Sequence, residues 1–237
     1  SNVVKIVSNN IKTGSIDPKK TNTFAILPIR GTSSKLKKIN LIELTINRLK
    51  NSKYINKIVV TSDNRQTLKL SKDLGSDIQI LRPKKLSKPN VNLEEVQKYT
   101  LKELEKKGHE IDLVLHCEET YPFRDRDIFD KMIMKILSEG LDTVIISKNE
   151  NNWLWSEKNN AFYRVDSGDV PRNFKEKSMI GYHGIGCLTY PEFVRNGKLL
   201  GKKIGLLEIK NPLSFIEVRS STSIKIAEQI LINSKIL

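Results

Sequence analysis

The chain has 237 residues, of which 38% are hydrophobic and 29% are charged, and it carries a formal net charge of +14. These values argue against a disordered chain and are typical of a soluble globular protein. The charge favours anionic partners or, equally well, reflects a composition bias with solvated lysine faces, and an aromatic content of only 6% argues against nucleic acid. Because no apolar run is long enough to cross a bilayer and the N-terminal residues lack a secretion signal, we expect a cytoplasmic protein that does not associate with membranes.

Short runs rich in Ile, Val and Leu alternate with amphipathic patterns along the first two thirds of the chain. The runs predict strands buried on both faces, at residues 23–29, 57–62, 77–81, 112–117 and 142–147. Apolar residues at spacings of three and four predict helices at 41–51, 64–74, 92–107 and 125–139. Since parallel strands need crossover connections, this alternation predicts a doubly wound, mostly parallel α/β sheet with sites at the carboxyl ends of its strands.

The pattern changes at about residue 148. Residues 152–165 predict two short strands joined by an Asn-Asn turn, inside a protruding arm at 148–182. Strand patterns return at 184–190, 202–209 and 213–218, and a closing helix is expected at 221–235. No repeat or Pro-rich linker divides the chain, so we predict one domain over residues 1–237 with an N-terminal extension at 1–22.

Four aromatic side chains in the arm need a covering surface, which predicts a homodimer formed through the arm. They are Trp153, Trp155, Phe162 and Tyr163. We interpret the two tryptophans as core or dimer contacts and not as a platform for stacking bases. Cys117 and Cys187 lie in apolar contexts without metal-ligand spacing, so we expect buried thiols, and His116 inside "LVLHC" is expected in the core.

The first strand runs into the polar loop "RGTSSKLKK" at residues 30–38. At the carboxyl end of a strand, backbone NH groups and basic side chains can bind phosphate. The loop lacks the spacing of a P-loop and has a single glycine, so by itself it fits a solvated basic loop equally well. The same alternative stays open for Lys35 and for the following lysines, Lys37 and Lys38.

From about Thr23 to its C-terminus the chain resembles the cytidylyltransferases that make CMP-activated acidic sugars, the acylneuraminate and 3-deoxy-manno-octulosonate enzymes. The resemblance rests on the order and spacing of "ILPIRGTSSKL", "VVTSDN", "ILRPKKL", "TYPFRD", "PRNF", "GKLLGKKIGLLEI" and "FIEVRSSTSIKIAE". It implies a Rossmann-like fold of the nucleotide-diphospho-sugar transferase type. It also implies transfer of CMP from CTP to an acidic 2-keto sugar, with release of pyrophosphate and with Mg²⁺ offsetting charge.

The resemblance further implies roles for individual residues. Arg30 would neutralise the triphosphate as a catalytic residue, helped by donors from Gly31, Ser33, Ser34 and Lys35. Arg82 and Asn92 would contact the nucleotide, although Arg82 before a proline equally fits a loop ion pair. The residues facing the sugar would be Glu118, Arg172 and His183. An acid or base role for His183 and a packed structural role both stay open.

Three positions depart from the family pattern. Glu118 replaces a glutamine, Glu217 replaces the first aspartate of the family's I-D-I-D segment, and Arg219 replaces the second. Glu217 can still bind Mg²⁺ through oxygen, whereas Arg219 cannot bind a cation. Arg219 is expected on the same face as Glu217, and either both have catalytic roles or the two form an ion pair that fills an abandoned metal site. Two hypotheses follow: an active cytidylyltransferase, or a catalytically weak homologue that binds nucleotide or nucleic acid as an interaction module.

Overall fold

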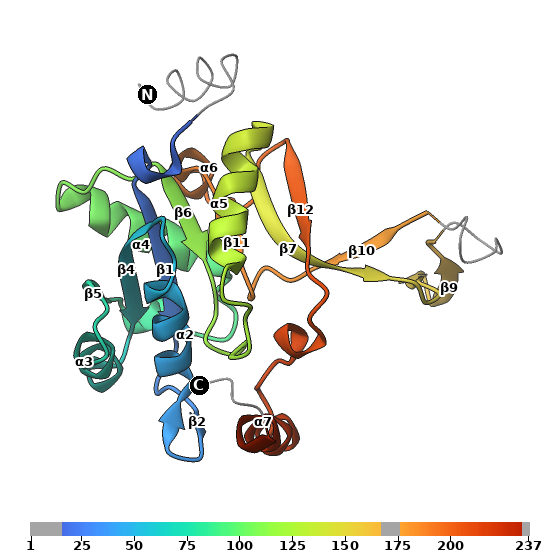
Figure 1. Ribbon diagram of the computed structural model, residues 1–237, viewed down its shortest axis with the longest axis horizontal. Coiled ribbons are helices and arrows are strands. Elements are labelled where there is room, and N and C mark those ends of the chain that lie inside the picture. Colours follow the sequence, from blue (N-terminus) through green and yellow to red (C-terminus); the bar gives the residue numbers. More distant parts are fainter. Residues whose placement is uncertain (1–15, 167–175, 234–237) are drawn as a thin grey trace.

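The alternating apolar runs form the centre of a mixed eight-stranded sheet in the computed structural model, which describes residues 16–166 and 176–233 (Figure 1). β1 (Thr23–Ile29) lies between β4 (Ile55–Ser62) and β6 (Leu113–His116) and is parallel to both. β5 (Ile78–Leu81) continues the parallel arrangement beyond β4. The sheet therefore grows from β1 through β4 to β5, and the next strand in the chain, β6, is added on the other side of β1.

The second half of the sheet is mixed around the long strand β7 (Thr143–Glu150). β11 (Cys187–Thr189) is inserted antiparallel between β6 and β7, and β12 (Ile204–Glu208) is parallel to β7. The strand order is β10-β7-β11-β6-β1-β4-β5, with β12 paired to β7. The predicted doubly wound, mostly parallel sheet is therefore confirmed, and the antiparallel β11 is an addition to it.

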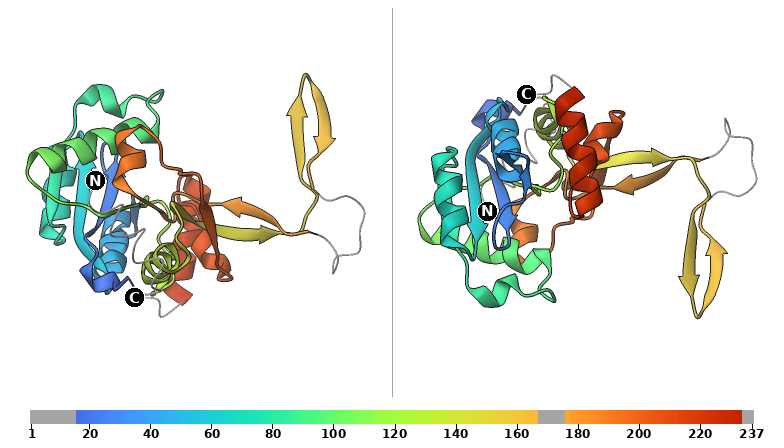
Figure 2. Two further views of the ribbon diagram at one scale, coloured as in Figure 1. Left: turned by 90° about the horizontal axis from the view of Figure 1, so that it is seen from above. Right: turned by 90° about the horizontal axis from the view of Figure 1, so that it is seen from below.

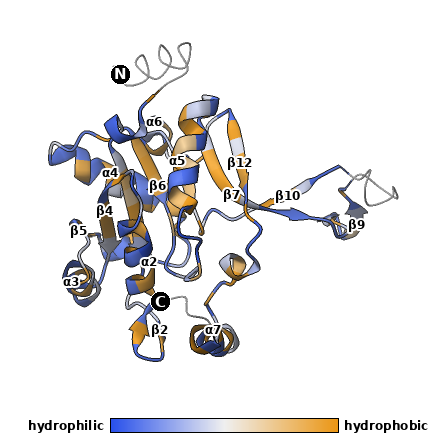
Figure 3. Ribbon diagram, viewed as in Figure 1, coloured by the Kyte–Doolittle hydropathy of each residue, from blue (hydrophilic) through white to orange (hydrophobic). Residues whose placement is uncertain are grey.

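Helices cover both faces of this sheet. One face packs against α2 (Leu41–Lys50), α3 (Arg65–Asp73) and α5 (Ile128–Glu139). The other face packs against α4 (Leu93–Lys106) and α6 (Pro191–Arg195). Figure 3 shows hydrophobic residues concentrated in the strands between these layers. Among the helices that the structure describes, none is both long and apolar enough to cross a membrane.

The buried thiols are confirmed, because Cys117 and Cys187 are both free and buried. Burial raises the pKa of Cys117 to about 11 and the pKa of Cys187 to about 12. A thiol reacts as its thiolate, so neither cysteine is set up for nucleophilic or redox chemistry. His116 is buried as predicted, at the end of β6.

The strand predicted at 213–218 is wrong. Pro212 begins a short 3₁₀ helix, η4 (Pro212–Phe215), and the side chain of Asn211 accepts a hydrogen bond from Leu213 N at 3.1 Å. A strand needs an extended backbone at this point. The chain turns instead, because Pro212 fixes φ and the side chain of Asn211 caps the turn. Residues 216–219 are consequently a loop that leads into the closing helix α7 (Ser221–Asn233).

The remaining short elements flank the ends of the larger ones. Before β1 lies η1 (Pro18–Lys20), and after β5 lies η2 (Lys84–Ser87). The polar loop that follows β1 leads into a small antiparallel pair, β2 (Lys35–Leu36) and β3 (Ile39–Asn40). This pair connects the loop to α2.

The predicted arm projects from the sheet (Figure 2). The outer half of β7 pairs with β10 (Ser178–Gly181), and the hairpin of β8 (Trp155–Lys158) and β9 (Ala161–Arg164) lies beyond this ladder. The Asn-Asn turn is confirmed, because Asn159 and Asn160 have φ values of 53° and 59°, which asparagine tolerates better than most residues. All four arm aromatics are exposed, up to 70% for Phe162.

Candidate functional site

A cleft of about 570 Å³ opens at the carboxyl ends of the central strands. Its walls are built from the segments that follow β1, β5 and β6 together with the start of α4. The chain reverses its direction of winding between β1 and β6, and ligands of open α/β sheets bind at such switch points. The fold thus places the cleft where the sequence analysis expected a site.

The loop after β1 enters the cleft through Arg30, Thr32 and Ser34. The turn at Gly31 has φ +65°, which glycine adopts without strain. Its N–H group donates to Asp63 Oδ1 at 3.1 Å, and Thr67 Oγ1 donates to its carbonyl at 2.6 Å. The polar loop is therefore fixed to the neighbouring strand–helix connection, with the side chain of Arg30 left exposed.

Four residues predicted to bind the nucleotide do not line the cleft. One is Gly31, which forms the turn described above. Ser33 lies beneath the loop, where its hydroxyl donates to Glu119 Oε2 at 2.5 Å and accepts from Ile42 N at 3.2 Å. Lys35 begins β2 and Asn92 immediately precedes α4, and both are exposed. The structure therefore brings Arg30, Ser34 and Arg82 together in the cleft, but not these four.

Arg82 lies at the end of β5 and is only 4% exposed, although it lines the cleft. Its Nε donates to Ser87 Oγ at 2.9 Å and its Nη1 donates to the carbonyl of Thr61 at 2.8 Å. Burial and the nearby charge of Arg30 lower the pKa of Arg82, while Asp63 opposes this effect. The guanidinium is thus held rigidly by neutral partners, which leaves its charge available to an anion in the cleft.

Glu118 follows β6 and stands at the opposite wall of the cleft. Its Oε2 lies 2.5 Å from Arg219 Nη2, and the same guanidinium contacts Glu217 through Nε. Glu217 lies in the loop after η4 and not at the end of a strand, which corrects the expectation about its setting. Arg219 and Glu217 do lie on the same side of the chain, as predicted.

Two histidines face the other oxygen of Glu118. Glu118 Oε1 is 3.8 Å from His116 Nε2 and 3.6 Å from His183 Nε2, and the two rings stack with centroids 6.1 Å apart. Burial works to raise the pKa of Glu118, but the facing imidazoles and Arg219 together lower it. Glu118 in turn raises the pKa of His183, whereas burial lowers the pKa of His116.

The closeness of these groups depends on Gly184. A Cβ atom at this position would lie 2.6 Å from Tyr121 Cε2 and 3.2 Å from Glu118 Cδ. Both distances are shorter than ordinary contacts between carbon atoms. A larger residue at position 184 would therefore push the segment that carries His183 away from Glu118.

Sequence reasoning missed Arg124, a buried residue that holds two loops at the cleft together. Its buried guanidinium donates to the carbonyl oxygens of Tyr121 at 2.5 Å and of Gly184 and Ile185 at 2.9 Å, and also contacts the carbonyl of Glu118. It thereby joins the loop after β6 to the loop before β11. The "TYPFRD" segment contains this arginine, but its role as a donor to backbone carbonyl groups became apparent only from its buried position in the structure.

Glu119 is a second residue that the sequence did not single out. It lines the cleft beside Glu118, and burial raises its pKa to about 7, although its hydrogen bonds with Ser33 and Ser34 act in the opposite direction. Near neutral pH this carboxyl group therefore exists in both protonation states. The signal available in the sequence was that two acidic residues, Glu118 and Glu119, directly follow the strand predicted at 112–117.

A metal ion held by protein side chains alone does not fit this site. Within residues 16–166 and 176–233, no group of three or more His, Cys, Asp and Glu side chains could hold a metal ion. Arg219 contacts both Glu118 and Glu217, so a guanidinium already occupies the oxygens that a cation would need. Magnesium binding by Glu217 stays a prediction, and Arg172 lies outside the described residues.

No family model and no curated protein sequence matches this chain. Solved structures do match its fold. A 4-diphosphocytidyl-2C-methyl-D-erythritol synthase from Anaerococcus prevotii aligns with a TM-score of 0.68 at 14% identity, covering 92% of this chain and 100% of its own.

A CMP:2-keto-3-deoxy-manno-octonic acid synthetase complexed with CTP aligns with a TM-score of 0.62 at 11% identity, over 90% of this chain and 99% of its own. Another 4-diphosphocytidyl-2C-methyl-D-erythritol synthase aligns with a TM-score of 0.62 at 10% identity, over 90% and 100% of the two chains. The expected resemblance is thus confirmed at the level of the fold, over nearly the whole chain.

Proposed function

We propose that this chain is a nucleotidyltransferase that transfers CMP from CTP to an acidic 2-keto sugar. The observation that carries the proposal is the convergence of Arg30, Arg82 and Arg219 on one cleft at the switch point of the sheet. A triphosphate is the kind of ligand that such a cluster of guanidinium groups neutralises. The shared fold supports the choice of CTP, since one of the matching proteins was solved with CTP bound.

In the proposed reaction, a hydroxyl oxygen of the sugar acid forms a bond to the α-phosphorus of CTP. The bond from that phosphorus to the bridging oxygen breaks, pyrophosphate leaves with the bonding electrons, and the hydroxyl releases its proton. Such a transfer needs positioning and charge neutralisation more than covalent help from the protein. Arg30 and Arg82 would offset charge on the triphosphate, with Ser34 as a further donor.

The acidic acceptor is proposed from the opposite wall of the cleft. Glu118 alone would repel a sugar carboxylate, but Arg219 and His183 offset its charge. Arg219 is exposed at this wall and can turn toward a carboxylate that enters the cleft. Arg219 therefore carries the proposed specificity for an acid, in addition to part of the charge neutralisation in the transfer step.

Pyrophosphate release tests this proposal most directly. The full chain is incubated with CTP and Mg²⁺ and with each member of a panel of 2-keto sugar acids, and the matching neutral sugars serve as controls. We expect release with at least one acid and none with the neutral sugars. A chain that releases no pyrophosphate with any acceptor, yet binds CTP, would contradict the transferase assignment.

The contact of Arg219 with both carboxylates favours a second candidate, a catalytically weak homologue that binds nucleotide as an interaction module. An ion pair that fills the place of a metal would leave nucleotide binding intact and remove turnover. The two candidates differ in their response to magnesium. The active enzyme should bind CTP more tightly with Mg²⁺ present, whereas the interaction module should bind CTP equally well without it.

A further inference from the structure

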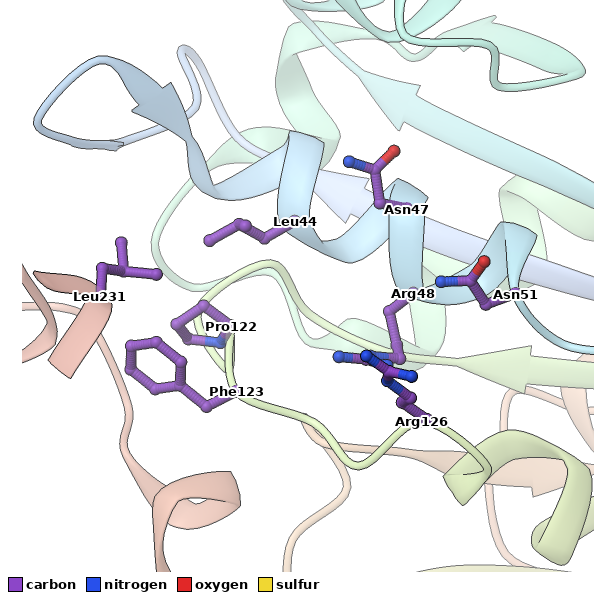
Figure 4. Close-up of a pocket in the computed structure, with 8 residues that line it drawn as sticks. All are labelled: Leu44, Asn47, Arg48, Asn51, Pro122, Phe123, Arg126 and Leu231. Carbon is purple, nitrogen blue, oxygen red and sulfur yellow. The ribbon is translucent and has the colours of Figure 1, made fainter. Parts of the chain in front are cut away.

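A second pocket, of about 340 Å³, lies between α2, the loop at 122–126 and the C-terminal part of α7. None of the side chains that line it also lines the cleft. The pocket has two chemically different ends (Figure 4). It is therefore a separate candidate for ligand binding, and the function proposed above does not use it.

The polar end holds two arginines with no carboxylate between them. Figure 4 shows the guanidinium groups of Arg48 and Arg126 side by side, with Asn47 and Asn51 at the same end. Within the described part of the chain, neither arginine side chain makes a hydrogen bond or an ion pair. Asp125, the nearby carboxylate, accepts a hydrogen bond from Asn211 Nδ2 at 2.7 Å.

The mutual repulsion of the two guanidinium groups contributes to a lowered pKa of Arg48. Burial lowers the pKa of Arg48, the adjacent charge of Arg126 lowers it further, and Asp125 offsets only part of the effect. Arg48 is half-buried, so water screens its charge less than at an open surface. Two like charges held close together without a partner are unfavourable, and an anion placed between them would relieve the repulsion.

The other end of the pocket is apolar. Figure 4 shows Leu44 of α2, Leu231 of α7 and the Pro122–Phe123 pair around this end. Pro122 and Phe123 are buried, and Phe123 belongs to a hydrophobic cluster that also contains Val218 and Ala227. This wall is thus firmly packed and can cover the uncharged part of a ligand that the arginines hold by its charged part.

We propose that this pocket is a binding site for a phosphate monoester with an apolar body. A phosphate monoester carries nearly two negative charges at neutral pH and three acceptor oxygens, which match two planar guanidinium groups. Asn47 and Asn51 add polar side chains to the lining at this end of the pocket. The apolar substituent would lie against Leu44, Phe123 and Leu231, away from solvent.

Titration calorimetry of the full chain with phenyl phosphate tests the site. We expect Arg126→Gln and Arg48→Gln each to weaken binding by about tenfold, the scale of one charge-assisted contact. Arg195→Gln on α6 removes an equal charge outside the pocket and should leave the affinity unchanged. Because Arg126 is exposed, its variant keeps the test valid even where Arg48→Gln disturbs folding.

Three further measurements locate the ligand and separate its parts. Arg30→Gln should leave phenyl phosphate binding unchanged, and a large loss in that variant would instead place the ligand in the cleft. Inorganic phosphate should bind about tenfold more weakly than phenyl phosphate, and phenol should show no measurable binding. Equal affinity for phosphate and phenyl phosphate, or unchanged affinity in both pocket variants, would overturn the proposal.

Discussion

The guanidinium of Arg219 lies 2.5 Å from the carboxylate of Glu118, at one wall of the cleft. Both residues depart from the pattern of the family that the sequence resembles, and the structure brings the two departures into direct contact. A carboxylate at position 118 and an arginine at position 219 therefore compensate each other. Changing one of them should expose the charge of the other, which makes the pair a good place to begin testing the site.

We first predict that Arg219→Gln lowers the rate of transfer by tenfold or more and increases the magnesium concentration needed for half-maximal rate. The reason is that one charge that offsets the acidic substrates is lost, so an additional Mg²⁺ ion must bind at the freed Glu118 and Glu217 before transfer proceeds. Magnesium titrations of pyrophosphate release measure both effects, with Arg195→Gln as the charge-matched control. An unchanged magnesium requirement would show that Arg219 does not take the place of a metal.

Replacement of Arg30 by alanine should weaken CTP binding by about tenfold or more, the scale of one charge-assisted contact. Arg30 is exposed at the cleft and follows β1 directly, so the truncation should not disturb the fold. Calorimetry with CTP measures the effect. Lys38→Ala, in the exposed turn between β2 and β3, is the control and should bind CTP normally. Equal affinities for the two variants would remove the loop from the nucleotide site.

His183 should titrate above its usual range, because Glu118 raises its pKa more strongly than burial lowers it. In Glu118→Gln the imidazole loses this carboxylate but keeps Arg219 nearby, so the pKa of His183 should fall. NMR titration of the histidine ring protons measures both values. A pKa of His183 that is the same in the two proteins would contradict the interaction.

Glu119 should make the protein less stable as the pH rises. Its folded-state pKa of about 7 lies above the ordinary value of 4.5, so its contribution to stability is complete below about pH 4.5 and is lost as the pH rises through 7. We expect Glu119→Gln to gain on the order of 1–3 kcal/mol relative to the wild type between these pH values. Urea denaturation of both proteins at the two ends of the range measures the difference.

The pKa of Glu118 is lowered, so its contribution to stability changes with pH in the opposite direction to that of Glu119. Because Glu118 is present in both proteins, its contribution cancels when the two are compared. A difference in the free energy of unfolding that does not change with pH would mean that Glu119 is ionised in the folded protein throughout the range. The hydrogen bonds that connect Glu119 to Ser33 and Ser34 would then be those of a carboxylate.

We expect the exposed aromatic residues of the arm to hold two copies of the chain together. Trp155 and Phe162 are 56% and 70% exposed, which is unusual for large apolar side chains in a monomer. The double variant Trp155→Ser, Phe162→Ser should sediment as a monomer at micromolar concentrations where the wild type is a dimer. Met134→Ser removes an exposed apolar residue of α5 and should leave the dimer intact. A wild-type monomer would contradict the prediction.

The order of strands and helices could be predicted from the sequence because apolar residues are spaced differently in buried strands and in amphipathic helices. The buried run at 23–29 coincides with β1, and the helices predicted at 41–51 and 92–107 agree within one residue at each end with α2 and α4. The strand predicted at 213–218 failed because the local turn that Asn211 and Pro212 form prevailed over the apolar pattern. Apolar spacing reports burial, and it does not report how the backbone hydrogen bonds are satisfied.

The site was only partly readable for a different reason. Arg30 could be proposed because its loop follows a strand, and sites in such sheets lie at the strand ends. Arg82 and Glu118 could be proposed from the resemblance to the cytidylyltransferases. Only the tertiary structure decided that Arg124 holds carbonyl groups, that Glu119 is half-buried, and that Arg48 of α2 lies near Arg126 of a distant loop. Burial and proximity set charge interactions and pKa values, and both depend on segments that are far apart in the chain. The sequence by itself determined which side chains reach the ends of the strands, and packing decided which of them became partners.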